Sequence, residues 1–575
     1  SYIAGEMQGF PRHLSIHSGG FTLSADPIID IVPIEPARKE GRTIIQWDKY
    51  DLDILGLIKV DVLSLGMLTC LSKALKLTGK KLYEIPADDK PTYEMIQRCD
   101  TVGTFQVESR AQMSMLGRLQ PANFYDLVVQ VAIVRPGPIV GDMVHPYLKR
   151  RRGLEKVIYP NKIVESILGK TMGVPLFQEQ VMKLAIDLAG FSPGESDLLR
   201  KSINAWKTSR PMGEMGDRLR RGLINGGMSI EFADQIFKQI QGFSHYGFPE
   251  SHAASFALLA YVSCYLKCHH PAEFACSLVN SQPMGFYRND TIIYDAIRHG
   301  ARVLPVSLNK SQWDCTIEEP NTVRLGFKVV SGLSKTHVQT MINEREQKNF
   351  TSLTDFLKRS SLRADVIQRL ALASRFEDFN WSARESLWAI MEYENVLTKQ
   401  SETQLSFFTH TSYLNDAEAA TQKTPRFSEL DGFEKIQGDY GAFSLSLQGH
   451  PMQELRKTMP NIPKMTSKKI REMKSGSQIK TCGLVLIRQK PPTAKGTCFS
   501  TLEDEYGFID LVLFPDTFEK YNDVFLNHCF IIVGGKMERD GNTISIIVNH
   551  VAPLWNTETL HETPLALEPD QYFWG

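Results

Sequence analysis

The stretch IQWDKYDLDILGLIKVDVLSLGML, residues 45–68, contains a strand, a turn and the start of a helix, and one acidic residue in it needs an explanation. Residues 58–63, IKVDVL, are typical of a buried β-strand, yet Asp61 lies in their middle. An unpaired carboxylate in apolar surroundings costs several kcal/mol of free energy. Asp61 therefore needs a partner, either a metal ion or a Lys or Arg side chain from elsewhere.

The position of Asp61 suits a metal ligand as well as an ion pair. Strand alternation puts Lys59 and Asp61 on one face, and the strand runs into a turn at residues 64–66, just before a helix. Asp51 and Asp53 form a nearby Asp-x-Asp pair that would suit Mg²⁺. The polar run around this pair is also typical of a solvated loop, so the alternatives stay open on residue chemistry alone.

Around this stretch, the hydrophobic period divides the chain into segments. Residues 1–65 show strand-like alternation, and Leu68, Leu71 and Leu75 then follow a helical period that Gly79 ends. We expect mostly helix over residues 80–290, mixed structure and then helix over 290–400, and a polar, irregular stretch over 401–470.

From residue 479 onward, the hydrophobic period changes to two. The segments IKTCGLVLI, GFIDLVLF, CFIIVGGKM and NTISIIVNHV begin at residues 479, 507, 529 and 542 and are separated by turn residues. Short alternating strands of this number and size are typical of an OB-fold. The sequence therefore predicts a multidomain α+β protein that ends in an OB-fold β-barrel.

Composition limits the class of protein. The 575 residues suffice for roughly four domains of about 150 residues each. No segment is long and apolar enough to cross a membrane, no secretory leader is visible, and nine scattered cysteines favour a cytoplasmic location. The net charge of zero is the sum of an acidic C-terminal tail and basic clusters at residues 149–152 and 200–210.

The run GFSPG, residues 190–194, matches the nucleophile elbow of hydrolases, but its context indicates a helix cap. An elbow serine follows a buried strand, whereas the residues before Ser192 have helical spacing. Ser192, Pro193 and Glu195 have the pattern of a capping box. We interpret Ser192 as an N-cap and not as a nucleophile.

The helix that follows Ser192 is expected to carry a basic face. Arg200, Asn204 and Lys207 share one side of the helix by their spacing, and Lys201 flanks them. Such a face suits a triphosphate or a phosphodiester backbone. A solvated basic surface is the alternative.

Two segments that contain His with Cys or Ser have ordinary explanations. The run CYLKCHHPAEFAC, residues 264–276, fits no common zinc spacing, so we expect its thiols to be buried in helices. Ser251 and His252 are adjacent on an expected helix and therefore cannot face each other as a catalytic pair. We expect Ser251 to cap this helix, and His252 either points at a phosphate or is packed.

Three weaker signals point to nucleic acid or to partners. The run GLSKTHVQTMINER, from Gly332, is typical of the hairpin and second helix of a helix-hairpin-helix module, which contacts DNA phosphates through backbone N–H groups. Phe499, Phe508 and Phe514 of the expected barrel are either base-stacking or core residues. QLSFF, residues 404–408, has the composition of a peptide that docks into a hydrophobic groove.

Taken together, these stretches resemble the bacterial DNA polymerase III alpha-type polymerases, the C-family. The resemblance covers nearly the whole chain and rests on residues 46–68 and on the blocks GTFQVESRAQM, VAIVRPGP, PLFQEQVM, SPGESDLLRKS and YGFPESHAASFALLAY. The runs ESRAQMSML, KCHHPAEFACSLVNSQPMGFY and FPRHLSIHSGGF are most similar to its error-prone, damage-inducible (ImuC-like) branch.

The resemblance implies that the chain is the C-terminal portion of such a polymerase. The expected parts are a partial mixed-sheet palm at 1–75, mostly helical fingers at 76–290, a helix-hairpin-helix region at 291–400, a linker at 401–475, an OB-fold at 476–555 and a tail at 556–575.

The resemblance also implies roles for individual residues. Asp61 matches the third carboxylate of the polymerase palm, and the Pro-Asp-x-Asp-x-Asp-Phe motif that holds the other two does not occur in this sequence. The implied mechanism is nucleotidyl transfer with two Mg²⁺ ions, for which Asp61 is a catalytic metal ligand. The residues implied to hold or surround the incoming triphosphate are Arg200, Lys201, Lys207, Arg135 and His252.

The implied partners are primer-template DNA and dNTPs, together with a sliding clamp and other mutasome proteins. Gln404, Leu405, Phe407 and Phe408 match a clamp-binding peptide, although in the error-prone branch this contact is often delegated to a partner. The leading hypothesis is an error-prone DNA polymerase for translesion synthesis in damage-induced mutagenesis. The alternatives are a replicative alpha subunit and a non-catalytic DNA-binding and assembly module.

Overall fold

The structure is a computed structural model in which the chain forms two compact units, residues 1–69 and 70–575. It describes residues 2–7, 16–17, 19–38, 40–62, 65–134, 144–205, 214–242, 248–285, 287–360, 362–373, 375–376, 379–402, 425, 427–490, 494 and 496–554. Of the helices among these residues, none is long and apolar enough to cross a membrane.

The first unit is built from short elements. They are α1 (Tyr2–Glu6), β1 (Gly20–Leu23), η1 (Ile28–Asp30), β2 (Ile34–Pro36), β3 (Thr43–Ile45), α2 (Lys49–Ile54) and β4 (Ile58–Asp61). β1 pairs with β4 and β2 pairs with β3, and both pairs are antiparallel. The expected mixed sheet is therefore wrong for these residues, since a parallel pair needs a long crossover and only residues 37–42 join β2 to β3.

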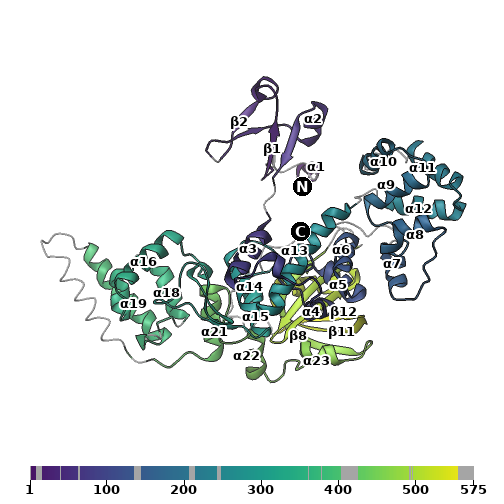
Figure 1. Ribbon diagram of the computed structural model, residues 1–575. Coiled ribbons are helices and arrows are strands. Elements are labelled where there is room, and N and C mark those ends of the chain that lie inside the picture. Colours follow the sequence, from purple (N-terminus) through teal and green to yellow (C-terminus); the bar gives the residue numbers. More distant parts are fainter. Residues whose placement is uncertain are drawn as a thin grey trace. The chain divides into compact units, whose positions relative to one another are not determined.

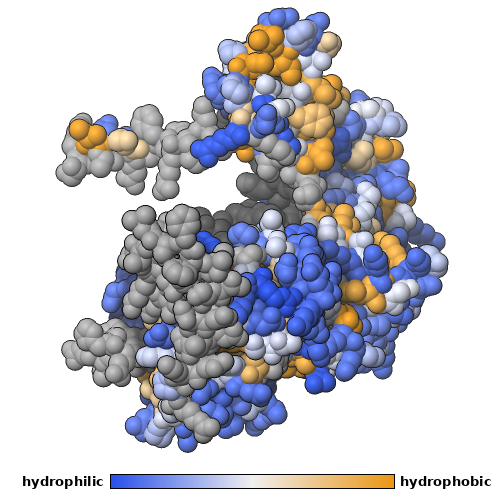
Figure 2. All heavy atoms as spheres, turned by 90° about the vertical axis from the view of Figure 1, so that its left-hand side faces the viewer, coloured by the Kyte–Doolittle hydropathy of each residue, from blue (hydrophilic) through white to orange (hydrophobic). Residues whose placement is uncertain are grey.

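The strand that carries Asp61 is exposed, and not buried as its composition suggested. Ile58 of β4 is 62% exposed, and Phe21 and Leu23 of the paired strand β1 are about half exposed. A two-stranded sheet has no second layer of its own to cover these side chains. Figure 2 shows orange, apolar side chains among the hydrophilic ones of this unit, at the top of the picture.

The second unit begins with a helical region. Its elements are α3 (Gly66–Thr78), which crosses the boundary between the units, η2 (Leu82–Glu84), α4 (Lys90–Gln97), α5 (Arg110–Leu119), α6 (Phe124–Ile133), α7 (Val144–Arg151), α8 (Lys162–Leu168), η3 (Gly169–Thr171), α9 (Gln178–Asp187), α10 (Pro193–Ala205), α11 (Glu214–Asn225), α12 (Ile230–Gly242), α13 (Glu250–His269) and α14 (Pro271–Asn280). The mostly helical character expected for residues 80–290 is confirmed.

Helix α13 is the core helix of this region. Its small residues Ala253, Ala257 and Ala260 are buried, and it packs against α4 and α6. The helix begins at Glu250 after Pro249, so the expected cap at Ser251 is wrong by two positions. Pro249 starts the helix without a side-chain cap because proline has a backbone suited to a helix N-terminus.

A module of helices and a small sheet follows. Its elements are α15 (Asn289–Arg298), β5 (Arg302–Leu304), β6 (Thr316–Glu319), β7 (Thr322–Arg324), η5 (Phe327–Val329), α16 (Lys335–Gln347), α17 (Leu353–Arg359), α18 (Ala364–Leu372) and α19 (Ala383–Glu402). The Ser334 side chain caps α16 by accepting from the backbone N–H of His337 at 3.3 Å, and Gly332 before it has a positive φ of 83°. This is the hairpin-and-helix arrangement that GLSKTHVQTMINER predicted.

The described part of the stretch expected to be irregular contains three helices, α21 (Gly432–Phe443), α22 (Pro451–Thr458) and α23 (Ser467–Glu472). Each has a side-chain cap, from Asp431, His450 and Thr466 respectively. The expectation was wrong because these helices are short and polar, so their caps are a stronger signal than their hydrophobic period.

The C-terminal domain is a closed five-stranded barrel. Its elements are β8 (Gln478–Gln489), β9 (Cys498–Asp504), β10 (Gly507–Leu513), α24 (Pro515–Asn527), β11 (Phe530–Asp540) and β12 (Thr543–Pro553), and the strand order is β10-β12-β11-β8-β9. Alternate residues of β10 are buried, and Leu502, Leu511 and Ile531 in the barrel core are fully enclosed. The predicted OB-fold is confirmed, and Figure 1 shows its strands beside α4 and α5.

Candidate active site and nucleic-acid interface

Asp61 is the last residue of β4 and lies opposite Gly20 of β1. Its side chain is 42% exposed, and Lys59 Nζ donates to both carboxylate oxygens, at 2.6 and 2.7 Å. These hydrogen bonds from Lys59 hold the pKa of Asp61 below its ordinary value. The partner of Asp61 in the structure is therefore a lysine two residues earlier on the same face of the strand, which is the ion-pair alternative.

Two residues that the sequence analysis did not single out complete the surroundings of Asp61. The Nδ1 of His17 accepts from the backbone N–H of Gly19 at 3.2 Å, and its Nε2 lies 3.9 Å from Asp61 Oδ1. A Cβ on Gly20 would lie 2.8 Å from His17 Nδ1 and 2.9 Å from Asp61 Oδ1. Only glycine at position 20 leaves this space free, and the Gly-Gly pair before the strand was the available signal.

These groups fit one part of a magnesium-binding site. Mg²⁺ prefers oxygen ligands and is commonly held by one or two carboxylates together with substrate phosphates. Asp61 supplies such an oxygen donor on an accessible strand end, whereas the imidazole nitrogen of His17 suits a hydrogen bond better than Mg²⁺. The metal role of Asp61 stays a prediction, since Lys59 occupies both of its oxygens here.

The Asp-x-Asp pair lies on a helix and not in a loop. The Asp48 side chain accepts from the backbone N–H of Asp51 at 3.0 Å, and Asp51 accepts in return from the N–H of Asp48 at 3.1 Å. Reciprocal bonds of this kind start α2 as a capping box. Asp51 is therefore engaged in capping, and the side chain of Asp53 lies outside the described residues.

The cap at Ser192 is confirmed. Ser192 Oγ accepts from the backbone N–H of Glu195 at 3.3 Å, and the Glu195 carboxylate accepts from the N–H of Ser192 at 2.9 Å. Helix α9 precedes this cap where a hydrolase elbow would need a strand. Glu195 also pairs with Arg218 of α11, and the hydrogen bond from the Ser192 backbone is the main cause that lowers its pKa to about 2.

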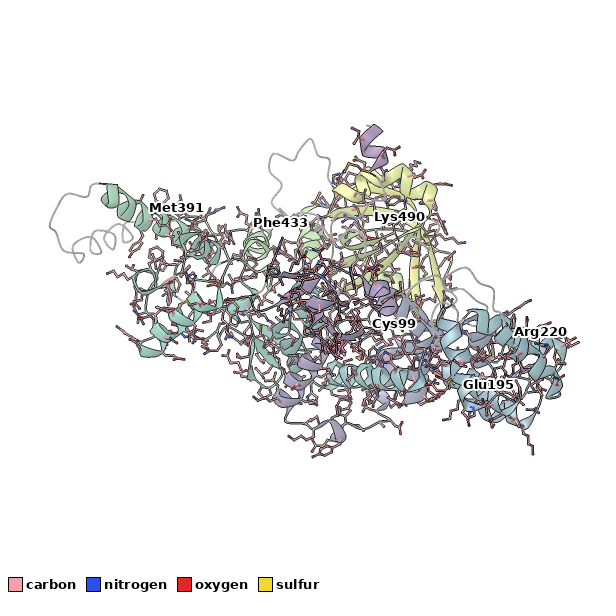
Figure 3. All side chains as sticks on the ribbon, turned by 90° about the horizontal axis from the view of Figure 1, so that it is seen from above. Cys99, Glu195, Arg220, Met391, Phe433 and Lys490 are labelled. Carbon is pink, nitrogen blue, oxygen red and sulfur yellow. The ribbon has the colours of Figure 1, made fainter. Side chains whose placement is uncertain are left out.

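On the predicted basic face of α10, the structure describes the side chain of one residue, Arg200. Arg200 is half-buried, and its Nε donates to Asp197 Oδ1 at 2.9 Å. Lys201 is on the same helix, but its side chain is not described, and Lys207 and Arg135 lie outside the described residues. Figure 3 labels Glu195 of this helix and Arg220 of α11. Arg220 forms an ion pair with Asp234 of α12.

His252 lies in the first turn of α13 and is exposed. Its ring contacts the rings of Phe248 and Phe256, with centroid distances of 5.1 and 4.2 Å. The structure shows the packed alternative, since the ring lies between two aromatic rings, and a contact of the exposed His252 with a phosphate stays a prediction.

The basic cluster at residues 149–152 mostly serves the fold. Arg150 pairs with Glu155 at 2.9 Å, and Arg151 forms a two-pronged pair with Asp126, with both distances 2.6 Å. Arg152 reaches Asp540 of the barrel at 3.5 Å. The sequence showed this run only as a basic cluster, and the carboxylates that engage these arginines are 25 or more residues away in two of the three cases.

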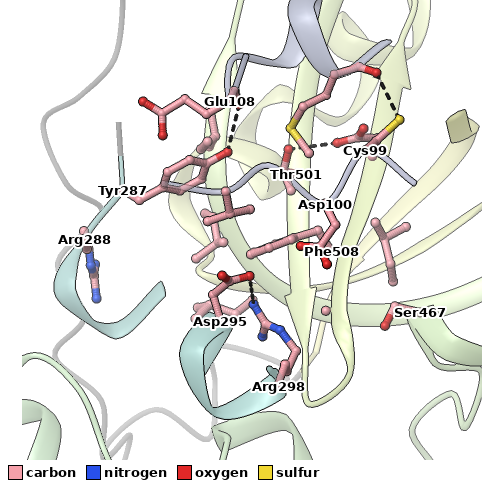
Figure 4. A pocket seen from close by; sticks show the side chains of 18 of the residues that line it. Cys99, Asp100, Glu108, Tyr287, Arg288, Asp295, Arg298, Ser467, Thr501 and Phe508 are labelled. Carbon is pink, nitrogen blue, oxygen red and sulfur yellow. Dashed lines mark hydrogen bonds and ion pairs between the residues drawn. The ribbon is translucent and has the colours of Figure 1, made fainter. Parts of the chain in front are cut away.

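The barrel faces a cavity of about 1750 Å³ that α5 and α15 help to enclose. Figure 4 shows Thr501 and Phe508 of the barrel together with Tyr287 and Arg298 from the helical side. The Arg298 guanidinium lies 5.1 Å from the centroid of the Phe508 ring. Phe499 and Phe508 are half-buried, while Phe514 is 51% exposed, so Phe514 is the most accessible of the three predicted stacking residues.

Within the part of the chain that the structure describes, one group of carboxylate and imidazole side chains has metal-like spacing, namely Asp100, Asp295 and His299. The buried Lys267 already supplies the positive charge there, with Nζ at 3.0 Å from Asp100 and 2.8 Å from Asp295. Cys264 and Cys276 are buried helix thiols as expected, whereas Cys268 is only half-buried, and among the described residues the group with metal-like spacing includes none of the three. The segment 404–408 lies outside the described residues.

Four known family models match successive segments of the chain, in the same order as its domains. Residues 1–64 match the bacterial DNA polymerase III alpha NTPase domain, residues 67–227 its finger domain, residues 300–386 a helix-hairpin-helix motif, and residues 479–554 an OB-fold nucleic-acid-binding domain. Together with the fold, these matches make the chain similar, in the order of its domains, to the class of bacterial DNA polymerase III alpha proteins.

The curated relatives narrow this class. The chain is 43% identical to an error-prone DNA polymerase of Bdellovibrio bacteriovorus, 44% to error-prone DNA polymerase 1 of Agrobacterium fabrum, and 43% to an error-prone DNA polymerase of Methylococcus capsulatus. These matches cover 94–96% of this chain and 52–54% of the relatives. The chain is similar to these polymerases over nearly its whole length, and it spans about half the length of the curated relatives it matches.

Proposed function

We propose that this chain is part of an error-prone DNA polymerase that acts in translesion synthesis during damage-induced mutagenesis. The observation that carries the proposal is the identity of 43–44% to error-prone DNA polymerases over nearly the whole chain. A replicative alpha subunit is the second candidate, because the matching family models are those of DNA polymerase III alpha.

In this proposal, Asp61 is a catalytic metal ligand for Mg²⁺. When bound, Mg²⁺ would neutralise phosphate charge and lower the pKa of a primer 3′-hydroxyl. Asp61 would orient the ion with its accessible carboxylate, and Lys59 would hold that carboxylate in place before the ion arrives. His17, whose Nδ1 accepts from Gly19, would direct its Nε2–H towards the same carboxylate.

The triphosphate-binding residues that we propose are Arg200, Lys201, Lys207, Arg135 and His252. Arg200 supports this role because it is only half-buried and its partner Asp197 is a near neighbour on the same helix, so a phosphate can compete for the guanidinium. His252 supports it because its ring is accessible in the first turn of a helix, where backbone N–H groups favour anions.

The proposed partners are primer-template DNA and dNTPs. The helix-hairpin-helix module would contact the duplex backbone, and the barrel would contact the single-stranded template with Phe514 as an accessible stacking residue. Gln404, Leu405, Phe407 and Phe408 would bind a sliding clamp, and other mutasome proteins would complete the assembly. The domain limits at residues 75, 290, 400, 475 and 555 belong to the same proposal.

The test is primer extension across a template lesion with Mg²⁺, using the protein encoded by the complete gene. We expect Asp61→Asn to abolish extension and to leave DNA affinity unchanged, while Asp30→Asn, a change at an exposed carboxylate of the same unit, extends normally. Extension at the wild-type rate by Asp61→Asn would refute the role of Asp61.

A depletion experiment separates the two candidate polymerases. Loss of an error-prone polymerase should lower damage-induced mutation while growth continues, whereas loss of a replicative subunit should stop growth. A protein that binds DNA but never extends a primer would instead be an assembly module.

A further inference from the structure

The tip of the hairpin between β11 and β12 is held by two arginines of the helical region. Arg118 at the end of α5 places its Nε 2.8 Å from Asp540 Oδ2, and Arg152, just after α7, places a guanidinium nitrogen 3.5 Å from Asp540 Oδ1. Both arginine side chains are 37% exposed, and Asp540 is 50% exposed. One carboxylate thus bridges two accessible guanidinium groups.

The two arginines retain unused capacity for hydrogen bonds. The Nε–H of Arg118 is buried and has no hydrogen-bond partner within the described part of the chain, because it is close to Asp540 without pointing along the bond direction. Among the described residues, Arg152 donates to the backbone oxygen of Arg118 at 3.4 Å and to Asp540 at 3.5 Å, which are long contacts. A recess of about 500 Å³ lies between these groups, and Arg151 lines it as well.

The docking of the hairpin onto α5 depends on two glycines. A Cβ on Gly117 would lie 2.2 Å from Thr543 Oγ1, and a Cβ on Gly541 would lie 2.2 Å from the carbonyl oxygen of Gly117. The side chain of Asn542 also donates to the carbonyl oxygen of Gln97 at 2.8 Å. The close backbone approach and this bond show that the contact is specific.

The hairpin belongs to a part of the OB-fold that commonly contacts nucleic acid, namely the loop between its last two strands. An arginine fork recognises carboxylate and phosphate oxygens by the same geometry, and a phosphate offers more acceptor oxygens. We propose that Arg118 and Arg152 form a binding site for a phosphate of a single-stranded nucleic-acid backbone, and that Asp540 covers this site while the barrel is docked. The inference rests on the proposed function, since it presumes that the chain binds nucleic acid.

The experiment measures the affinity of the whole protein for an oligo-dT strand as a function of salt. Asp540→Asn removes the competing charge, and Gly117→Ala separates the hairpin from α5 without changing any charge. We expect both variants to bind oligo-dT at least about threefold more tightly than the wild type. The apparent affinity of a covered site equals its intrinsic affinity multiplied by the fraction of molecules in which the site is uncovered. Asp523→Asn, on the exposed surface of α24, and Gly441→Ala, a helical glycine with open space around it, are the matched controls and should bind like the wild type.

The arginines are tested by the double variant Arg118→Gln, Arg152→Gln. Each phosphate contact on a single strand contributes about 0.7 to the slope of log affinity against log salt concentration, so the slope should flatten by about that amount. Wild-type affinity and slope in all three site variants would overturn the inference, as would weaker binding by Asp540→Asn. Binding of oligo-dT by the wild type that is absent or independent of salt would refute the proposed function itself.

A second experiment tests whether the site binds a phosphate of a nucleic-acid backbone or a free pyrophosphate. Inorganic pyrophosphate is titrated against Asp540→Asn and wild type by calorimetry. Tighter binding of oligo-dT alone supports a backbone phosphate, whereas tighter binding of pyrophosphate with unchanged binding of oligo-dT would overturn the assignment to nucleic acid.

Discussion

Lys59 and Asp61 form a two-pronged ion pair on the same face of β4, with the lysine Nζ at 2.6 and 2.7 Å from the two carboxylate oxygens. The pair keeps the carboxylate charged and oriented on an exposed strand. It also places a positive charge where a Mg²⁺ ion would approach.

Replacing Lys59 by Met should raise the affinity of this site for divalent cations by about fivefold, because the competing ammonium charge is removed. The measurement is binding of Mn²⁺ to the complete protein by electron paramagnetic resonance, beside the Mg²⁺ concentration that half-saturates primer extension. Lys59→Arg keeps the charge, and Lys76→Met removes a lysine charge elsewhere, so both should bind Mn²⁺ as the wild type does. Unchanged Mn²⁺ binding in Lys59→Met would mean that Asp61 is not a metal ligand.

Glu108 should make the protein less stable as the pH rises towards neutral. Its carboxyl is buried beside the large cavity, where it accepts from the backbone N–H of Gly103, and burial raises its pKa to about 7. Between the ordinary carboxyl pKa and this value, the folded state holds a proton that the unfolded state has released. Stability is therefore fully present below the unfolded pKa and decreases as the pH rises, by at most about 3 kcal/mol.

Glu108→Gln keeps the acceptor oxygen and removes this titration. The melting temperature of the variant should exceed that of the wild type at pH 8, and the difference should shrink towards pH 4.5. Glu94→Gln, at an exposed helix position, should show no such trend. Parallel pH profiles of Glu108→Gln and wild type would contradict the raised pKa.

Ser192→Ala should destabilise the start of α10 by about 1 kcal/mol, since it removes the acceptor for the backbone N–H of Glu195. Hydrogen exchange of the α10 amides measures this local change without unfolding the whole chain. Ser192→Asp retains a capping oxygen and should exchange nearly as slowly as the wild type. Equal exchange rates in Ser192→Ala and wild type would show that the cap is not needed.

Lys267→Met should cost about 3–5 kcal/mol of stability, because it leaves Asp100 and Asp295 without their buried cation. The lysine side chain is only 2% exposed, so water cannot replace it. Thermal unfolding measures the loss, and Lys90→Met, which removes an exposed lysine paired with Glu94, is the control. A melting temperature within a degree of the wild type would contradict a structural role for this network.

Local signals in the sequence predicted several elements correctly. The capping box at Ser192 and the alternation of the barrel strands involve residues within a few positions of one another, so the chain itself brings them together. The same kind of signal at Asp48, Asp431 and His450 was present but was outweighed by the polar composition around it. Short helices are therefore better predicted from their caps than from their hydrophobic period.

The partners of charged residues could not be predicted in the same way. The sequence showed residues 150–152 only as part of a basic cluster, and it did not reveal that Arg151 pairs with Asp126 and Arg152 with Asp540. The burial of β4 was wrong for a related reason, since the hydrophobicity of a strand does not reveal whether a second layer covers it.

The sequence by itself determined the order of the domains, the barrel and the family, because these depend on periodicity and on motifs that are contiguous along the chain. Strand alternation already put Lys59 on the same face as Asp61, although the structure was needed to show that they pair. Only the tertiary structure decided that Asp540 pairs with Arg118 and Arg152. Ion pairing depends on distances of a few ångströms in space, and folding creates such distances between residues that are hundreds of positions apart in the sequence.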